Sequence, residues 1–372
     1  MNNLDLFYFT ARCLMLDDHP ELGEEIKATM KEEKIDWNRF VSLCSNNLIL
    51  PVIYLKFKRN NIIELLPSGL SDFLKEIYDL NVIRNTLILK QINEVTETLN
   101  KNHITPIFLK GAAHLIDEVY SDIGERIMTD IDFLVSEEDY LKSANILMDN
   151  GYSIPTDIPA FVIPEYQKHY PRLSKKGYVA DLEVHRTLTE QTLNWFNSRI
   201  VTAEMRPSKK LNKCYVLSDK HKIIHNFVHS QMNSDGHSES IISLKDIYDL
   251  YLLSKNTSLL PVLQAIECKQ KAIGYFAFAD KTFGLNKTLF PETNIYSKIL
   301  IFRHNLNQRS FIFYHINRTI RFFKHRIFEV YLAYLIKSVY SREMRRSVIK
   351  KFRDPEWYRL FFRHYTNFFS RK

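Results

Sequence analysis

The chain has 372 residues, of which 45% are hydrophobic and 25% are charged. This length and composition allow two or three globular domains and exclude a disordered or fibrous protein. The sequence contains no secretory signal pattern at its start, no run of eighteen apolar residues and no C-x-x-C pair among its four cysteines. We therefore expect a cytoplasmic protein without a membrane span, a zinc ribbon or a disulfide framework.

The formal net charge of +8 is unevenly distributed along the chain. Residues 296–372 contain 18 Lys and Arg against four Asp and Glu, a net charge of +14, whereas residues 1–295 carry a net charge of −6. The basic character therefore belongs to the C-terminal region and not to the whole chain.

Residues 1–100 are predicted to be helical. Apolar residues recur there at three- and four-residue steps, most clearly over 37–57 and 71–99, and Pro51, Pro67 and Gly69 punctuate the pattern.

The pattern changes at His103, where ITPIFLK, a short β-branched and aromatic run, precedes Gly111 and a segment with helical spacing. This order predicts a strand, a turn and a helix. RIMTDIDFLV (126–135) and GYVADLEVHR (177–186) predict two further strands, with a helix that ends at Gly151 between them. Residues 101–215 are therefore expected to form a small α/β core.

Helical spacing returns over residues 216–295, which we expect to form a helical domain packed on the core. Residues 296–372 then predict a tail of basic helices rich in Phe and Tyr.

Alternation along 126–135 places Asp130 and Asp132 on one face of the predicted strand and its apolar residues on the other. Two carboxylates about 7 Å apart on one face repel unless a cation lies between them. In 177–186, Asp181, Glu183 and His185 share a face in the same way.

If these two strands are neighbours, three carboxylates meet and suit Mg²⁺, which prefers oxygen ligands. Two such ions hold the attacking and leaving oxygens in phosphoryl or nucleotidyl transfer. The alternative is an acidic pair on the exposed face of an edge strand, which is common without a metal.

Lys110 and Gly111 stand where the first predicted strand ends and a helix begins. Free backbone N–H groups at a helix start favour phosphate, and a glycine allows close approach. This pair is therefore a candidate phosphate-binding turn.

A strand ending in a glycine turn, a helix, a D-x-D strand and a later acidic strand resemble the nucleotidyltransferase core of the DNA polymerase β superfamily. LKGAAHLIDEVY, DIDFLV, LEVHR, HNFVH and LKDIYDLYLL, together with 37–57, more closely resemble the family of uncharacterised bacterial nucleotidyltransferases. The resemblance spans about residues 20–255 and implies an α+β nucleotidyltransferase fold flanked by helical regions.

The resemblance implies that Asp130 and Asp132 bind both metal ions and that Glu183 is the third acid, with Asp181 as the alternative. The superfamily's usual Gly-Ser turn is replaced by Lys110-Gly111-Ala112. Lys110 supplies a charge where the serine would supply a hydrogen bond.

Five further residues have open roles. Arg126 could bind the triphosphate, brace Asp130 and Asp132, or be a solvated loop residue. His225 and His229, with Asp246, resemble a polar patch that faces the catalytic core, and His229 is a candidate nucleotide-binding residue. Together with His221 they could also form a zinc-binding stripe, although no H-E-x-x-H motif completes it.

The basic tail has three interpretations. Its aromatic and basic residues could bind RNA, could lie on an anionic membrane, or could belong to a helical bundle with a solvated basic face.

The resemblance implies a transferase that moves NMP from a nucleoside triphosphate such as ATP to a hydroxyl and releases pyrophosphate. Mg²⁺ is the expected cofactor, with Mn²⁺ as the other candidate, and a protein, a small molecule or tRNA is the expected acceptor. The alternative is an inactive protein of the same fold that docks on nucleic acid or a membrane through its tail.

Overall fold

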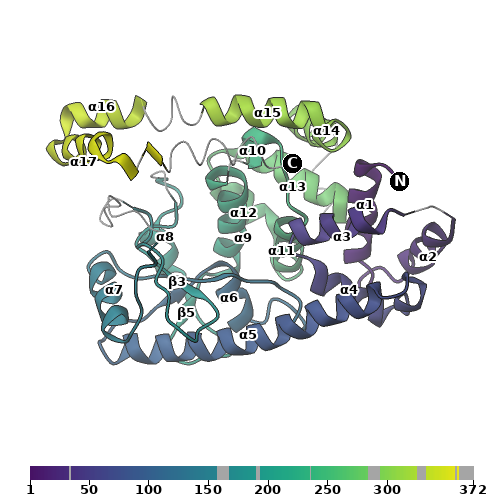
Figure 1. The fold of residues 1–372 in the computed structure, drawn as a ribbon, viewed down its shortest axis with the longest axis horizontal. Coiled ribbons are helices and arrows are strands. Elements are labelled where there is room, and N and C mark those ends of the chain that lie inside the picture. The colour runs from purple at the N-terminus through teal and green to yellow at the C-terminus, as the bar shows by residue number, and fades with distance from the viewer. Residues whose placement is uncertain are drawn as a thin grey trace.

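Helices surround a small mixed sheet in the computed structural model of the chain, which confirms the predicted α+β fold with a polymerase β-like core (Figure 1). The structure describes residues 1–32, 35–156, 167–189, 193–234, 236–283, 294–324, 332–356 and 358–359. Residues 360–372 of the predicted tail lie outside this range.

Every element described in residues 1–100 is a helix, as the spacing of apolar residues predicted. Side chains cap two of these helices, since Asn2 accepts a hydrogen bond from the backbone N–H of Asp5 and Asp36 accepts one from that of Arg39. The elements are α1 (Asn3–Leu14), α2 (Leu22–Glu32), α3 (Trp37–Asn46), α4 (Leu50–Arg59), a 3-10 turn (Ile63–Leu65) and α5 (Leu70–Asn100).

The five strands have the order β3-β2-β1-β5-β4. β2 is parallel to β3 and antiparallel to β1, which is parallel to β5. The strands are β1 (Ile107–Phe108), β2 (Asp130–Leu134), β3 (Asp181–His185), β4 (Arg206–Pro207) and β5 (Tyr215–Val216). The helices α6 (Lys110–Ile116), α7 (Tyr140–Asp149) and α8 (Ser198–Ala203) connect them.

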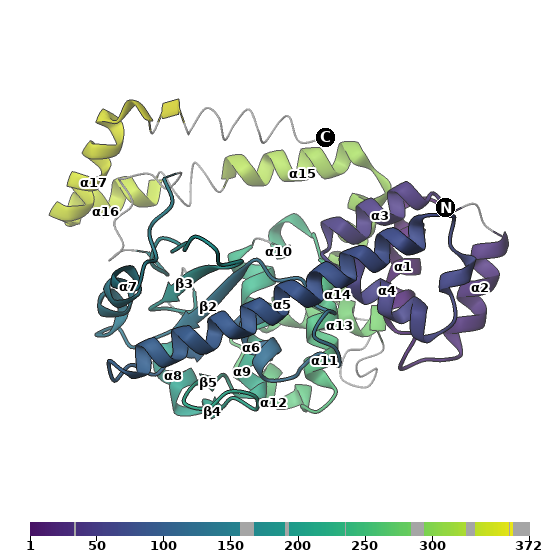
Figure 2. The same cartoon turned by 60° about the horizontal axis from the view of Figure 1, so that its bottom comes forward.

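Helix α5 has 31 residues, about 46 Å at 1.5 Å per residue, and runs from the N-terminal helices to the sheet (Figures 1 and 2). Its second half packs Ile88 and Ile92 against the apolar residues of β2 and β3 in one buried cluster. Ile131 and Phe133 of β2 belong to that cluster, so the apolar face of this strand is covered, as its alternation predicted.

The middle of α5 also holds the segment that leads into β2. The Asn81 amide donates to the backbone oxygens of Gly124 and Arg126, and the Asn85 amide donates to those of Ile123 and Arg126. A Cβ at Gly124 would overlap the α5 side chains, so the segment approaches the helix closely only because residue 124 is a glycine.

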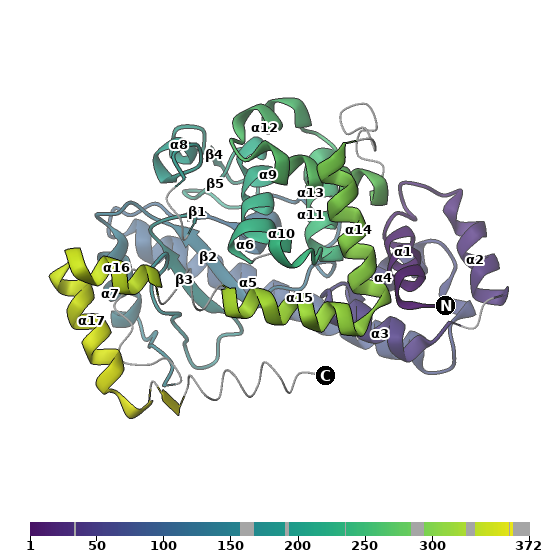
Figure 3. The same cartoon turned by 90° about the horizontal axis from the view of Figure 1, so that it is seen from above.

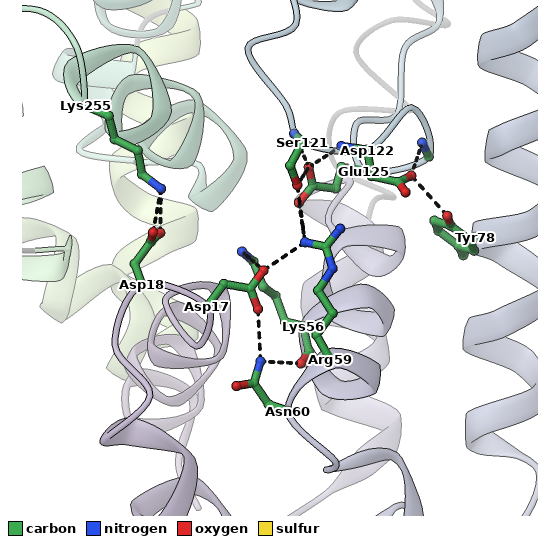
Figure 4. Close-up of polar contacts among 11 residues, drawn as sticks. Asp17, Asp18, Lys56, Arg59, Asn60, Tyr78, Ser121, Asp122, Glu125 and Lys255 are labelled. Atoms are coloured by element: carbon green, nitrogen blue, oxygen red, sulfur yellow. Dashed lines mark hydrogen bonds and ion pairs between the residues drawn. The ribbon is translucent and has the colours of Figure 1, made fainter.

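A polar network joins the N-terminal helices to the same segment (Figure 4). Asp17 is 2.9 Å from both Lys56 Nζ and Arg59 Nη1, and the Arg59 guanidinium also donates to Ser121 Oγ at 3.2 Å. The buried Glu125 carboxylate accepts from the backbone N–H of Ser121 at 2.9 Å. The N-terminal helices thus contribute to the position of the approach to β2.

The helices of residues 216–295 lie between the sheet and the N-terminal helices (Figures 1 and 3). They are α9 (Asp219–Phe227), a π-helical turn (Val228–Asn233), α10 (Gly236–Glu239), α11 (Leu244–Ser254), α12 (Leu259–Ala265) and α13 (Lys269–Phe283). The four cysteines of the chain are free thiols, as expected: Cys13, Cys44, Cys214 and Cys268.

The described tail consists of α14 (Ile295–Arg309), α15 (Phe311–Lys324), α16 (Ala333–Tyr340) and α17 (Arg342–Arg353). α14 packs on α13, where Leu300 is buried close to Gly274, while α15, α16 and α17 lie along one edge of the molecule (Figure 1). Among the described helices, none has the length and apolar content that crossing a membrane requires.

The burial of His304 in α14 predicts that the stability of the folded protein depends on pH. His304 is buried between the rings of Phe7 and Phe278, whose centroids lie 4.8 and 4.6 Å away. Burial lowers its pKa to about 4, whereas an unfolded histidine titrates near 6.5. Below about pH 6.5 the unfolded chain therefore gains a proton that the folded chain does not bind, and stability is lost as the pH falls towards 4.

Urea denaturation of wild type and His304→Leu between pH 7 and pH 5 tests this prediction. The wild-type free energy of unfolding should fall more steeply, by about 1.4 kcal/mol per pH unit below pH 6.5, than that of the variant. His19→Leu is the control, since the His19 side chain is 44% exposed, and its slope should match wild type. Equal slopes for wild type and His304→Leu would contradict the prediction.

Candidate active site

The acidic strands are direct neighbours in the sheet. The parallel register of β2 and β3 places Asp132 opposite Glu183 and Asp130 opposite Asp181. All four acids therefore project from adjacent strands on the face predicted from the alternation.

A compact cluster forms around Asp132, which is buried. Ligand atoms of Asp132, Glu183 and His185 all lie within 4.8 Å of one another. His185 Nε2 is 2.8 Å from Asp132 Oδ1, and because an ionised carboxylate only accepts, the imidazole donates this bond. Two carboxylates and an imidazole within this distance fit a divalent cation.

His185 is a member of this cluster that the sequence prediction did not assign a role. Alternation had placed it on the same face as Glu183, and that pattern is the signal by which it could have been found. Asp130 lies on the same strand face as Asp132 but outside the group of three.

Lys110 is the nearest cation to the acids. Its Nζ donates to Asp132 Oδ1 at 2.5 Å and lies 3.9 Å from Glu183 Oε2. Burial alone would lower the pKa of Lys110, but the charges of Asp132 and Glu183 outweigh burial and raise it. The ammonium therefore stays charged beside the acidic strand.

The two carboxylates of the D-x-D pair have opposite pKa shifts. Burial would raise the pKa of Asp132, but Lys110 and the hydrogen bond from His185 hold it well below its usual range. Burial and the charge of Asp132 raise the pKa of Asp130. The surroundings therefore favour the ionised form of Asp132 more strongly than that of Asp130.

The structure separates Glu183 from Asp181. Glu183 Oε2 lies 3.5 Å from His185 Nε2 and 3.9 Å from His169 Nε2, within the cluster. Asp181 instead accepts a hydrogen bond from Ser174 and lies 3.7 Å from Arg172. The geometry therefore favours Glu183 as the acid that acts with Asp132.

The backbone of Lys110 has φ = 46°, in the left-handed region that residues with a Cβ rarely adopt. Lys110 is the first residue of α6 and directly follows the chain that leaves β1. A non-glycine residue in this conformation costs about 1–2 kcal/mol, and such residues are enriched at functional sites.

Gly111 accommodates protein side chains in this structure. A Cβ at this position would overlap the Arg126 guanidinium and the Met128 side chain. The glycine therefore allows Arg126 to lie against the start of α6, in addition to the close phosphate approach predicted for it.

The Arg126 side chain is only 12% exposed and is paired with a carboxylate, so the interpretation as a solvated loop residue is wrong. Its guanidinium Nη2 donates to Asp249 Oδ2 of α11 at 2.9 Å. The predicted partners Asp130 and Asp132 are not the carboxylates it contacts. Asp249 could not be found from the sequence because no spacing relates it to Arg126, 123 residues earlier.

Asp249 is the centre of a buried polar group. It also accepts a hydrogen bond from Tyr120 and lies 3.8 Å from His114 Nδ1. Burial would raise the pKa of Asp249, but the charge of Arg126 and the contact with His114 hold it well below its usual range. The Arg126–Asp249 pair thus fixes α11 against the segment before β2.

A pocket of about 210 Å³ adjoins the acidic strand. Lys110, Arg126 and Asp130 line it from the sheet side, and His225, His229 and Asp246 line it from the helical side. The polar patch predicted for these last three residues therefore faces the core.

The histidine stripe divides between two environments. His229 lines the pocket, and burial, followed by the charge of Lys110, lowers its pKa to about 3, so the ring is neutral at pH 7. His221 is outside this lining, and its Nδ1 lies 3.9 Å from Glu204. The three rings do not converge on one position as a zinc site requires.

The chain was compared with known proteins. A family model described as an uncharacterised nucleotidyltransferase matches residues 33–291. No curated protein matches the chain. The matched region contains the acidic strands, Lys110, the pocket and Asp249, whereas α14 to α17 follow it.

Proposed function

Because the chain belongs to the uncharacterised nucleotidyltransferase family, we propose that it transfers NMP from a nucleoside triphosphate to a hydroxyl acceptor and releases pyrophosphate. The observation that carries the proposal is the pairing of Asp132 with Glu183 on adjacent strands, beside a pocket lined by Lys110, Arg126 and His229. The carboxylates that would bind metal ions therefore lie next to the basic side chains that would bind phosphates.

Asp130, Asp132 and Glu183 are the proposed metal ligands, and Mg²⁺ or Mn²⁺ suits their oxygens. When bound, the metal would neutralise charge on the triphosphate. His185 orients Asp132 through the 2.8 Å hydrogen bond that its Nε2 donates.

In the proposed reaction the acceptor hydroxyl oxygen bonds to the α-phosphorus of the triphosphate, and the bond from that phosphorus to the bridging β-phosphate oxygen breaks. Glu183 takes the hydroxyl proton. Lys110 and the backbone at Gly111 bind the departing β- and γ-phosphates, assisted by Arg126. His229, neutral in the pocket, donates or accepts one hydrogen bond to the nucleotide.

A nucleoside triphosphate, for example ATP, is the proposed donor, and its supply agrees with the predicted cytoplasmic location. The acceptor classes remain a protein side chain, a small molecule and tRNA, all of which carry a hydroxyl. Incubating the protein with labelled nucleoside triphosphates and cell extract, then identifying the labelled product, distinguishes them.

The test of the proposed function is Mg²⁺-dependent thermal stabilisation by each nucleoside triphosphate. The wild type should be stabilised by its donor only with the metal, and the double variant Asp130→Asn with Asp132→Asn should lose this response. No stabilisation of the wild type by any triphosphate would overturn the enzymatic proposal and favour the inactive binding protein. Stabilisation without labelled product in extract would also favour that alternative.

Lys110→Met tests the phosphate-binding role. It removes the ammonium but keeps a long side chain, so we expect the triphosphate Kd to rise about tenfold or more, the loss of one charge-assisted contact. Isothermal titration in Mg²⁺ measures the change.

Lys90→Met is the control for this variant, since Lys90 lies on α5 outside the pocket lining, and it should leave affinity unchanged. An unchanged Kd in Lys110→Met would exclude the phosphate contact.

A further inference from the structure

Helix α15 is attached to the rest of the molecule through a polar side chain. The Asn317 amide donates to the backbone oxygen of Glu239 in α10 at 2.6 Å. Arg303 of α14 donates to Asn317 Oδ1 at 3.3 Å. A helix packed on a protein core normally turns its apolar stripe inward, but here an asparagine makes this contact.

The apolar stripe of α15 is turned towards solvent instead. Ile312, Ile316, Ile320 and Phe323 follow one another at helical steps of four, four and three residues. Their exposed fractions are 71%, 52%, 63% and 41%. Single exposed apolar residues are ordinary, but a continuous stripe along one helix marks an interaction surface.

The next two helices also expose apolar side chains. Leu335, Ile336 and Val339 of α16 are each at least half exposed, and α17 exposes Ile349 and Phe352. Arg345 of α17 donates to the backbone oxygens of Ser338 and Val339, which ties the two helices together. Figure 3 shows α15, α16 and α17 across the same side of the molecule.

The charge of these helices is strongly positive. Their sequences contain ten Lys and Arg and one acid, Glu343. The exposed basic residues of α17 are Arg342, Arg345, Arg346, Lys350 and Arg353. An occupant of this surface must therefore be both anionic and apolar, because a second copy of the chain would bring two positive surfaces together.

The aliphatic residues favour one of two anionic ligands, a lipid membrane, over the other, single-stranded RNA. Single-stranded RNA binds by stacking its bases on aromatic rings. The exposed large apolar residues of the three helices are mainly aliphatic: seven are Ile, Leu or Val, and four are aromatic, namely Phe311, Phe323, Tyr340 and Phe352. Isoleucine inserts into the acyl boundary of a bilayer, and the flanking Lys and Arg meet anionic headgroups. The 14 residues of α15 suit a helix lying in the interface plane.

We propose that α15, α16 and α17 form a peripheral binding surface for an anionic lipid membrane. The three helices lie C-terminal to the residues that the family model matches. The proposal therefore does not depend on the chemistry at the acidic strands.

The test is flotation of the full chain with phosphatidylcholine vesicles, with and without phosphatidylserine. The wild type should float only with phosphatidylserine, and high salt should weaken binding. Ile316→Glu with Ile320→Glu should lower the partition coefficient about tenfold or more, since two inserting side chains become charged. Unchanged thermal midpoints would show that this variant remains folded, as expected for exposed positions.

Leu80→Glu with Ile83→Glu is the matched control. These residues of α5 are 55% and 59% exposed, and their substitution should leave flotation unchanged. The proposal is overturned if the wild type does not float with phosphatidylserine, or if both double variants float equally. Salt-sensitive binding of single-stranded RNA without flotation would likewise overturn it, as would a solution dimer that the Ile316→Glu and Ile320→Glu variant dissociates.

Discussion

Asp132→Asn is expected to lower the rate of NMP transfer by about 10²–10³-fold, the usual effect of removing one group that stabilises developing charge. Asp132 is the buried acid whose pKa is held well below its usual range and which contacts Lys110 and His185. Asparagine keeps the shape of the aspartate side chain but removes its negative charge. Labelled product formation measures the rate, and thermal unfolding checks that the variant is folded.

Two further variants on β3 serve as the matched pair for this experiment. Glu183→Gln should cause a loss similar to that of Asp132→Asn, because Glu183 is the opposite residue in the register. Asp181→Asn should keep activity within a few-fold of wild type, because Asp181 contacts Ser174 and Arg172 outside the cluster. A severe loss in Asp181→Asn with an active Glu183→Gln would reverse the assignment of the third acid.

Asp249→Asn is expected to lower the free energy of unfolding by about 3–5 kcal/mol, the usual cost of breaking a buried ion pair. The substitution leaves the largely enclosed Arg126 guanidinium without a compensating charge and weakens the contacts of Asp249 with Tyr120 and His114. The pKa of Asp249 is depressed in the folded protein, so this stabilisation is fully present at pH 7. It is lost only in acid, as the pH falls below the pKa of an unfolded aspartate and through the depressed pKa of the folded state. Urea denaturation at pH 7 measures the change.

Asp246→Asn is the control on the same helix. Its carboxylate is 3.2 Å from Lys245 Nζ and is partly exposed, so the variant should change stability by about 1 kcal/mol or less. If Asp249→Asn is no more destabilising than Asp246→Asn, the buried pair does not stabilise the attachment of α11.

The sequence was sufficient for the parts of the fold that depend on local patterns. Alternation in DIDFLV defined both faces of β2, and alternation in LEVH put Glu183 and His185 on one face of β3. The predicted metal site required the two strands to be neighbours, and the register shows that they are neighbours and run parallel. Strong period-two patterns are informative because one slip would exchange the buried and exposed faces.

Contacts between residues far apart in the sequence could not be predicted from local patterns. Arg126 is a lone basic residue in the sequence, and only the packing of α11 brings Asp249 to it. The left-handed backbone of Lys110 could not be predicted either. In FLKGAA a glycine is the residue expected to adopt that conformation, yet the structure places it at the lysine before Gly111. The exposed stripe of α15 also reads, from spacing alone, as an ordinary buried face.

Helix α5 limits how small a working version of this protein could be. Its second half forms a wall of the core under β2 and β3, and Asn81 and Asn85 clamp the backbone that leads into β2. A fragment cut to begin at residue 101 would contain every proposed ligand, yet it would expose the underside of its own sheet and release the acidic strand. The smallest transplantable catalytic unit must therefore include α5 from before Asn81 onward.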